Sequence, residues 1–161
     1  MSDAHVFEII LAYPADASQL TPPAVNFSRN NIMRSAAKHE IAASSPAAFG
    51  GDDMRYNPEE LLLMSLSECH MLTYLAIAAK KQMTIVRYED RATGHLGAGE
   101  FGVAGKISMQ HVTLHPRITV APGTNPDEAR AIHTKAHANC FIANSVNFPI
   151  SIEGEIIESA L

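Results

Sequence analysis

The spacing of apolar and polar residues in the first part of this chain predicts short strands. Residues 5–13 form a strand candidate, and residues 27–41 give shorter strand-like pieces interrupted by Asn30 and Asn31. Residues 44–56 carry the proline, glycine and aspartate that are typical of a loop. We therefore expect strands and then a loop ahead of the first helix.

A long helix is predicted over residues 58–80, and its start is the clearest local signal in the sequence. Asn57 is a favoured N-cap, a proline suited to the first helical position follows it, and Glu60 stands where a capping box has its acid. Lys80 and Lys81 place positive charge at the negative end of the helix dipole. The helix is apolar on nearly all sides, so we expect it to be buried on most faces, wrapped by a sheet or by a second chain.

The apolar stretch over residues 61–79 is also about as long as a membrane span. Glu68 and His70 lie at its middle, where a charge costs roughly 2.5–3.5 kcal/mol by insertion scales. The better interpretation is a buried helix of a soluble protein, and we expect no membrane partner.

The rest of the chain predicts further strands and a second helix. Residues 86–92 alternate as a strand does, and the glycine-rich residues 94–105 predict a turn region. Residues 106–120 predict a second strand, which we expect to be bulged because its apolar phase slips between Met109 and Val112.

The helix-start signature of Asn57 recurs at Asn125, so a second helix is predicted to about residue 139. Residues 146–152 alternate cleanly and predict a final strand that Gly154 ends. Strands, long helix, strands, helix and strand follow one another without repeats or a dividing linker. This order predicts a single α+β domain over residues 1–161.

Charge and composition exclude one class of partner and suggest a compartment. The chain has 17 acidic and 12 basic residues and a formal charge of -5, and it contains no cluster of five or more Lys and Arg residues. Nucleic acid is therefore not an expected partner. Residues 1–14 lack the basic segment and the cleavage site of a secretory signal, so we expect a cytoplasmic protein. Two cysteines in that reducing compartment are more often catalytic, metal-binding or inert than a structural disulfide.

The residues alone leave the role of the two cysteines open. Cys69 lies deep in the long predicted helix, and Cys140 lies at the end of the second. Free cysteine is among the most buried residue types, so inert packing is one reading of both positions. Their spacing fits neither a zinc pattern nor a CxxC motif.

Two segments carry a family resemblance. The first is NPEELLLMSLSECHMLTYL, which contains Cys69, and the second is AHANCFIANSVNFPI, which contains Cys140. They resemble the two cysteine-bearing segments of OsmC and organic hydroperoxide resistance proteins, with a local sequence closer to the OsmC-like branch. The resemblance implies an OsmC-like fold, in which a long central helix packs against antiparallel sheets and two chains form an intertwined homodimer.

The same resemblance implies residue roles. Cys69 corresponds to the peroxidatic cysteine and Cys140 to the resolving one. In the family an arginine from the N-terminal strands stabilises the thiolate and is oriented by the glutamate of the NPE motif, which here is Glu59. Arg29 is the best match for the arginine, and Arg34 is the alternative.

A geometric demand follows from the helix. Ten residues of straight helix separate Glu59 from Cys69 by about 15 Å, so the two cannot share one small site within an unbroken helix. Either the helix breaks near Ser65, or Glu59 reaches the Cys69 of a second subunit. The nearly apolar circumference of the helix favours the second arrangement, an intertwined dimer.

The implied activity is a dithiol-dependent thiol peroxidase that reduces organic hydroperoxides in defence against oxidative stress. Its reductant in part of the family is a lipoylated protein, and it requires no metal or organic cofactor. Five apolar residues would suit an alkyl or lipid hydroperoxide, although core packing is the favoured reading of each: Met64, Met71, Leu72, Phe141 and Phe148.

Two other functions stay open from the sequence. One is a non-catalytic binding or stress protein of the same fold. The other is a metal-binding protein that uses His133 and His137, four residues apart on one helix face, together with Cys140. The effect of Glu68 and His70 beside Cys69 is also open, because a nearby carboxylate raises the pKa of a thiol.

Overall fold

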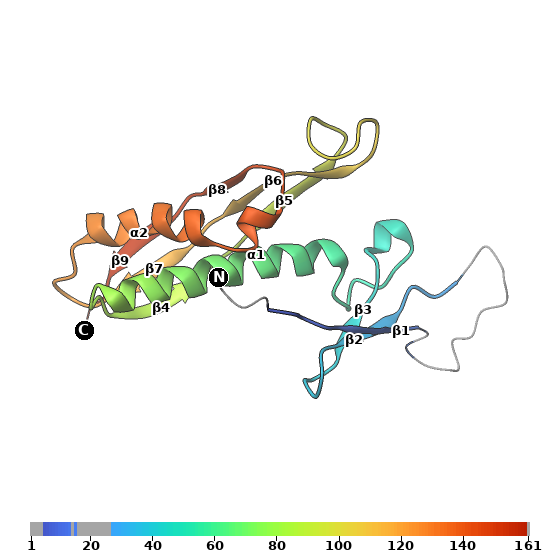
Figure 1. The fold of residues 1–161 in the computed structure, drawn as a ribbon, viewed down its shortest axis with the longest axis horizontal. Coiled ribbons are helices and arrows are strands. Elements are labelled where there is room, and N and C mark those ends of the chain that lie inside the picture. Colours follow the sequence, from blue (N-terminus) through green and yellow to red (C-terminus); the bar gives the residue numbers. More distant parts are fainter. Residues whose placement is uncertain (1–4, 14, 16–26, 161) are drawn as a thin grey trace. The chain divides into compact units, whose positions relative to one another are not determined.

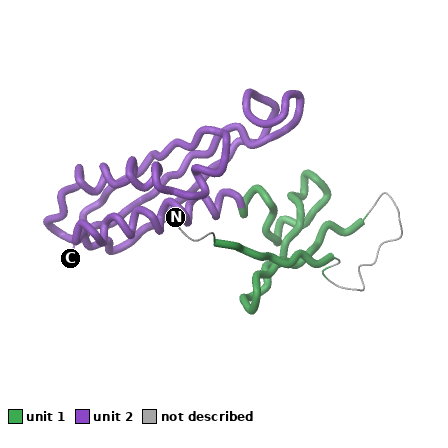
Figure 2. Tube along the Cα trace, viewed as in Figure 1, with its two compact units in different colours: residues 1–61 green, residues 62–161 purple. Residues whose placement is uncertain are grey.

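The computed structural model of this chain describes residues 5–13, 15 and 27–160. These residues fall into two compact units, residues 1–61 and residues 62–161 (Figures 1 and 2). Each unit is described by itself below. The single domain expected from the sequence stays a prediction.

The first unit is built on a three-stranded antiparallel sheet. Its strands are β1 (Ile10–Ala12), β2 (Asn31–Arg34) and β3 (Ile41–Ala43), and β2 lies in the middle. The strand predicted over residues 5–13 is therefore confirmed only in its C-terminal part. The short 3-10 helix η2 (Ala47–Phe49) interrupts the loop predicted after these strands.

Helix α1 (Pro58–Lys80) has the bounds that its end signals predict. The side chain of Asn57 accepts a hydrogen bond from the Glu60 N–H at 2.8 Å, and Glu60 Oε2 accepts one from the Asn57 N–H at 3.1 Å. This reciprocal pair is the capping box, which satisfies two backbone N–H groups that a helix start leaves open.

The second unit contains six strands arranged as two three-stranded sheets. The strands are β4 (Ile85–Glu89), β5 (Thr93–Gly97), β6 (Ser108–Leu114), β7 (Arg117–Val120), β8 (Ile150–Ile152) and β9 (Glu155–Glu158). One sheet has the order β4-β7-β9 and the other β5-β6-β8. Because β4 leads into β5, β6 into β7 and β8 into β9, three long strands are each interrupted at a corresponding point (Figure 1).

Several sequence predictions for this unit need correction. The glycine-rich residues 94–105, predicted as a turn region, begin inside strand β5, and strand β9 was not predicted. The sheets are mixed rather than antiparallel, because β8 pairs with β6 and β9 with β7 in parallel. The predicted bulge is confirmed: His95 pairs with His111 and Leu96 with Met109, which leaves Gln110 as the extra residue.

Helix α2 (Pro126–Asn139) also has the predicted bounds, with the Asn125 side chain accepting hydrogen bonds from the N–H groups of Asp127 and Glu128. Two buried clusters join the helices to the strands. The first contains Tyr74, Ala78, Ile118, Val120, Ala129, Ile132 and Ala136; the second contains Leu66, Met109, Val112 and Leu114. Both belong to the second unit, which holds the main core of the described chain.

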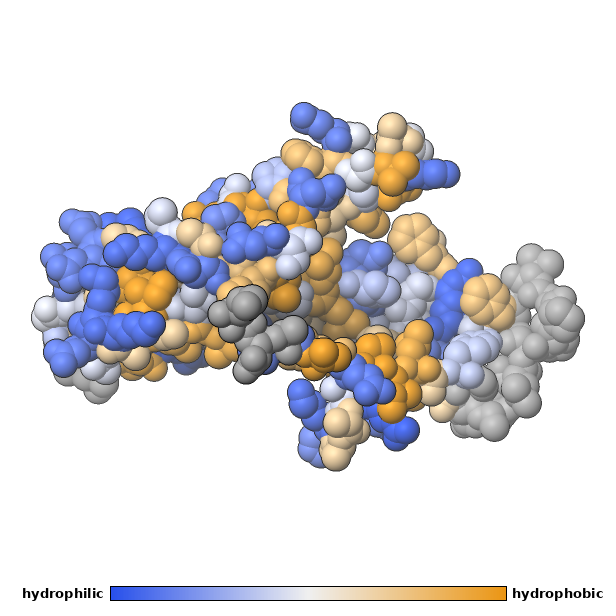
Figure 3. Space-filling model, in the orientation of Figure 1, coloured by the Kyte–Doolittle hydropathy of each residue, from blue (hydrophilic) through white to orange (hydrophobic). Residues whose placement is uncertain are grey.

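The prediction that α1 is buried on most faces is wrong for this chain taken alone. Its buried residues form one narrow stripe at four-residue spacing: Leu66, His70, Tyr74 and Ala78. Met64 and Leu72 on other faces are 47% and 55% exposed. The space-filling view likewise shows hydrophobic residues at the surface (Figure 3). Helix α1 is long and apolar enough to cross a membrane, but the core helix of a soluble protein can have the same length and composition. Residues of the buried stripe belong to both clusters, as expected of a core helix.

Candidate functional site

The second unit brings the two cysteines together. Cys69 lies about three turns into α1 and is half-buried, whereas Cys140 forms the C-cap of α2 and is 1% exposed. Both are free thiols, and Cys69 lies close enough to Cys140 to raise the pKa of the Cys140 thiol. The two thiols are therefore neighbours that no disulfide joins, and Cys69 is the more accessible of the two.

The environment of Cys140 keeps it protonated. Burial, followed by the neighbouring Cys69, raises the pKa of the Cys140 thiol to about 11. The N–H of Ala143 donates to Cys140 Sγ at 3.4 Å, which opposes this rise without cancelling it. At neutral pH Cys140 is a thiol, so it is a poor first nucleophile and requires removal of a proton before it can attack.

Hydroxyl groups fix the stretch of α1 around Cys69. Thr73 Oγ1 donates to the carbonyl of Cys69 at 2.8 Å, and Ser67 Oγ donates to Asp90 Oδ2 at 2.5 Å. Asp90 also accepts the N–H of His115 at 2.7 Å, where β6 gives way to β7. This aspartate thus joins the helix turn before Cys69 to the interruption in the strands.

A buried histidine pair lies next to the cysteines in sequence. His70 Nε2 is 3.1 Å from His133 Nδ1, and both side chains are buried. Burial, and then the neighbouring His133 and His137, lower the pKa of His70 to about 4; burial is also the main cause of a lowered pKa at His133. Both rings are therefore uncharged at neutral pH.

The absence of a side chain at Gly154 leaves room for this pair. A Cβ atom at Gly154 would lie 2.6 Å from His133 Nε2, a separation that side chains do not adopt. Sequence reasoning missed the pair. The available signal was the position of His133 between Ala129 and Ala136 on the buried face of α2.

The metal site considered for His133, His137 and Cys140 is not formed. His133 Nδ1 lies 3.1 Å from His70 Nε2, and the Cys140 thiol has Cys69 as its titratable neighbour. Within residues 5–13, 15 and 27–160, no group of three or more His, Cys, Asp or Glu side chains could hold a metal ion.

The first unit holds the two arginine candidates. Arg29 Nη1 donates to the Gly50 carbonyl at 3.4 Å, and the guanidinium lies 4.6 Å above the ring of Phe27. Gly50 has φ of 76°, and a Cβ there would lie 2.9 Å from Arg29 Nη1, so glycine serves both the turn and the close approach. Arg34 instead lies 4.0 Å from Glu40 on an exposed surface.

Arg29 also lines a cavity of about 300 Å³ in the first unit, together with Leu11, Tyr13, Phe27, Ser28, Asn31, Ser44, Ser45 and Pro58. Glu59 does not pair with it: no ion pair joins the two in the described part of this unit. Glu59 Oε2 is buried and has no hydrogen-bond partner among the described residues. The predicted orientation of Arg29 by Glu59 is therefore absent within this unit.

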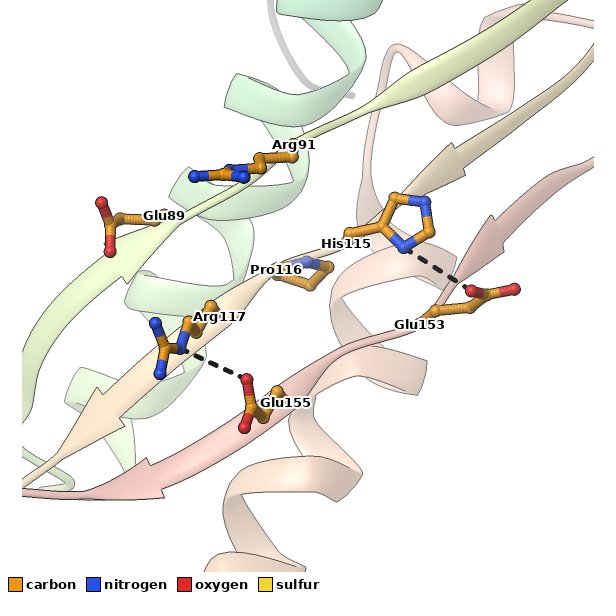
Figure 4. Close-up of a pocket in the computed structure, with 7 residues that line it drawn as sticks. All are labelled: Glu89, Arg91, His115, Pro116, Arg117, Glu153 and Glu155. Carbon is orange, nitrogen blue, oxygen red and sulfur yellow. Dashed lines mark ion pairs between the residues drawn. The ribbon is translucent and has the colours of Figure 1, made fainter.

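A second cavity, of about 360 Å³, lies at the interruption of the strands in the second unit and is lined by Glu89, Arg91, His115, Pro116, Arg117, Glu153 and Glu155 (Figure 4). His115 lies 3.5 Å from Glu153, and Arg117 lies 3.3 Å from Glu155 across neighbouring strands. These exposed cross-strand pairs are typical of a solvated sheet face.

Comparison with known proteins gives consistent results. The family model described as OsmC-like protein matches residues 50–155. The structure of an OsmC-like protein of unknown function from Vibrio cholerae is similar, with 30% identity and a TM-score of 0.78 over 96% of this chain and 100% of the other.

A more distant solved structure shows the same fold, and a further relative is similar in sequence. An organic hydroperoxide resistance protein from Elizabethkingia anophelis has 20% identity and a TM-score of 0.69 over 99% of this chain and 100% of the other. An uncharacterised protein from Acinetobacter baylyi is 26% identical over 125 residues, which are 75% of this chain and 80% of that protein.

Proposed function

This chain belongs to the OsmC-like family, and from that membership and the proximity of its two thiols we propose that it is a cysteine-based peroxidase for organic hydroperoxides. In this proposal Cys69 is the peroxidatic residue and Cys140 the resolving one. The observation that carries it is the asymmetry of the pair: a half-buried Cys69 stands against a fully buried Cys140 whose pKa is raised to about 11.

The reaction follows from that asymmetry. The Cys69 thiolate attacks the distal oxygen of the hydroperoxide, the O–O bond breaks, and the alcohol leaves with a proton while Cys69 becomes a sulfenic acid. Cys140 then displaces hydroxide from the Cys69 sulfur to give a disulfide, which protects Cys69 from further oxidation. An external dithiol, for which a lipoylated protein is one candidate, reduces the disulfide by thiol exchange.

A second copy of the chain completes the site in this proposal. Helix α1 is unbroken over its 23 residues, so the separation of about 15 Å between Glu59 and Cys69 stands. Met64 and Leu72 are exposed on α1, and Glu59 has a buried oxygen without a partner among the described residues. A homodimer that covers α1 would bury these apolar side chains and bring a partner to Glu59, with Arg29 stabilising the Cys69 thiolate.

The proposed location is the cytoplasm, where a dithiol reductant is available.

The apolar side chains Met64, Leu72 and Phe141 are exposed in the single chain and would suit an alkyl group better than water. This favours organic hydroperoxides over hydrogen peroxide as substrates.

The test uses stopped-flow consumption of cumene hydroperoxide by the reduced protein with excess dithiothreitol or dihydrolipoamide. Cys69→Ser should abolish turnover. With no dithiol added, Cys140→Ser should reduce one equivalent of peroxide and accumulate a sulfenic acid that dimedone traps. If the unmodified protein consumes no hydroperoxide, a binding or stress protein of this fold is the better account.

A further inference from the structure

Asp90 lies where the strands of the second unit are interrupted, and both oxygens of its carboxylate accept hydrogen bonds. Oδ1 accepts the N–H of His115 at 2.7 Å, and Oδ2 accepts the hydroxyl of Ser67 at 2.5 Å. The first bond joins Asp90 to the chain between β6 and β7, and the second joins it to α1. The proposed reaction so far gives this link between helix and sheet no role.

The bond to His115 is explained by the interruption of the strands. The ladder between β4 and β7 ends at Glu89, and the ladder between β5 and β6 begins at Thr93. His115 lies across from this gap and is followed by Pro116, which has no N–H to continue a ladder. Asp90 therefore supplies the acceptor that neither ladder gives to the His115 N–H, and this bond anchors the carboxylate to the sheet.

The bond to Ser67 reaches the helix turn that carries Cys69. Ser67 precedes Cys69 by two residues, which places the two side chains about 160° apart around α1. Leu66 and His70 are buried and lie between them, on the core face of the helix. Ser67 and Cys69 are both half-buried, so they lie along the two borders of that face. A rotation of α1 about its axis would therefore move one of them toward the core and the other away from it.

Small rotations of a helix matter to a reaction between two sulfur atoms. Outer side-chain atoms lie about 5–6 Å from a helix axis, so a rotation of about 10° moves such an atom by about 1 Å. A displacement of about 1 Å can slow a reaction between positioned groups about 100-fold. Apolar packing opposes such a rotation weakly because it has no preferred direction, whereas a hydrogen bond depends on angle as well as distance.

Two directional contacts at different places around α1 oppose its rotation better than one. The first joins His70 on the core face to His133 of α2, with 3.1 Å between the ring nitrogens. A helix held at one such point can still pivot about it. The bond between Ser67 and Asp90 is the second point, and it lies on the border of the core face opposite Cys69.

We propose that Asp90 is a positioning residue for the thiol reaction: through its hydrogen bonds with Ser67 and the His115 N–H, it fixes the rotation of α1 and so the approach of the Cys69 sulfur to Cys140. This inference rests on the proposed function, which assigns the two thiols to one reaction. Asp90 acts on the second step, in which the sulfurs must meet, and has little effect on the first attack by Cys69.

The charge of Asp90 is a different route by which it would act on its surroundings. Burial lowers the pKa of His133, and Asp90 acts against this change. Asp90→Asn separates the two roles, because an amide can still bond to the Ser67 hydroxyl and the His115 N–H but carries no charge. Asp90→Ala removes both the hydrogen bonds and the charge.

The test separates the two thiol steps with an aromatic disulfide, dithiobis-nitrobenzoate. The reagent releases one thionitrobenzoate when Cys69 attacks it, and a second when Cys140 attacks the resulting mixed disulfide. Ser67→Ala should leave the first release within about twofold of the parent rate and slow the second by at least about tenfold. Asp90→Asn should stay within about threefold of the parent in both releases, whereas Asp90→Ala should slow the second at least as much as Ser67→Ala.

Ser65→Ala is the matched control and should change neither release. Ser65 lies on the same helix, but its hydroxyl donates to the Leu62 carbonyl at 2.8 Å and so stays within α1. The melting temperature of each variant is measured alongside. Ser67→Ala leaves the bond to His115 in place, so it tests the proposal even where Asp90→Ala does not fold.

Three results would overturn the proposal. The first is a second release in Ser67→Ala as fast as in Ser65→Ala. Another is a first release that slows as much as the second, because the reactivity of Cys69 itself would then have changed. The last is a second release in Asp90→Asn as slow as in Asp90→Ala, because the charge and not the hydrogen bonds would then carry the effect.

The reagent contains no peroxide, so the two proposals fail separately. A protein that consumes no hydroperoxide but shows the Ser67 effect lacks the proposed peroxidase function while the positioning role stands. A protein that consumes hydroperoxide with an unaffected second release keeps its function and lacks Asp90 as a positioning residue.

Discussion

The two units of this chain differ in how complete their chemistry is. In residues 62–161 the two thiols are neighbours, and the histidine pair and Asp90 have their hydrogen-bond partners. In residues 1–61 Arg29 has no acidic partner and Glu59 has a buried oxygen without one, among the residues that the structure describes. The thiol pair and its surroundings thus lie in one unit, whereas the two charged residues that the proposed function assigns to the site lie in the other and lack partners there.

Replacing Arg29 should give the largest effect of the predictions below, and it tests the charged residues of the first unit. In the proposed homodimer Arg29 stabilises the Cys69 thiolate. An adjacent cation lowers the pKa of an acidic group by about 1–3 units, so Arg29→Ala should then lower the rate of Cys69 alkylation by iodoacetamide at pH 7 about 10- to 1000-fold. Arg34→Ala is the matched control and should change it less than about twofold. Equal effects of the two variants would remove the distinction between these arginines.

Acidification should destabilise residues 62–161, the unit that contains the histidine pair. The pKa of His70 is about 4 in the folded protein because of burial first, and about 6.5 when unfolded. Between these values the unfolded chain binds more protons, so the free energy of unfolding should decrease by roughly 3 kcal/mol as pH falls from about 6.5 to 4. Urea titrations across this range measure the slope, and His70→Gln should flatten it. A slope that persists in His70→Gln would place its origin elsewhere.

Gly154→Ala probes the packing that holds the histidine pair. The new Cβ would lie 2.6 Å from His133 Nε2, so the ring or the strand must shift at a cost of about 1–3 kcal/mol. Gly97→Ala is the control, since a Cβ there meets nothing within 4 Å. The urea midpoints of the two variants compare their free energies of unfolding. Equal stabilities would show that a small shift relieves the contact between the new Cβ and the His133 ring.

The smallest expected effect compares the two helix starts. Asn125→Ala removes an acceptor for two N–H groups and should cost about 1 kcal/mol of unfolding free energy. Asn57→Ala breaks a reciprocal capping box and should cost a similar amount. If only Asn57→Ala also alters peroxide turnover, the start of α1 contributes to the site through the position of Glu59.

The sequence predicted best what short-range signals determine. Both helices have the expected bounds because Asn57 and Asn125 cap them with their own side chains. Strand β5 was missed because its two glycines are typical of turns and not of strands. Strand β9 was missed because the residues of Glu155–Glu158 do not alternate between apolar and polar. Which elements pair in parallel depends on contacts between distant segments, which periodicity does not report.

The candidate site shows the same limit. The pairing of Cys69 with Cys140 came from family resemblance, since nothing in their spacing predicts it. The partner of His70 could not be predicted, because two helices that meet in space leave no mark of their register in sequence. Burial of α1 was overestimated because apolar composition shows that a surface requires covering without showing which chain covers it.

The most direct test of this account is mass spectrometry of the reduced protein after one equivalent of cumene hydroperoxide. The account predicts a bond between Cys69 and Cys140 within one chain, with one hydrogen lost from each thiol, and a stable sulfenic acid in Cys140→Ser. Both cysteines remaining as free thiols after the peroxide has been added would contradict it.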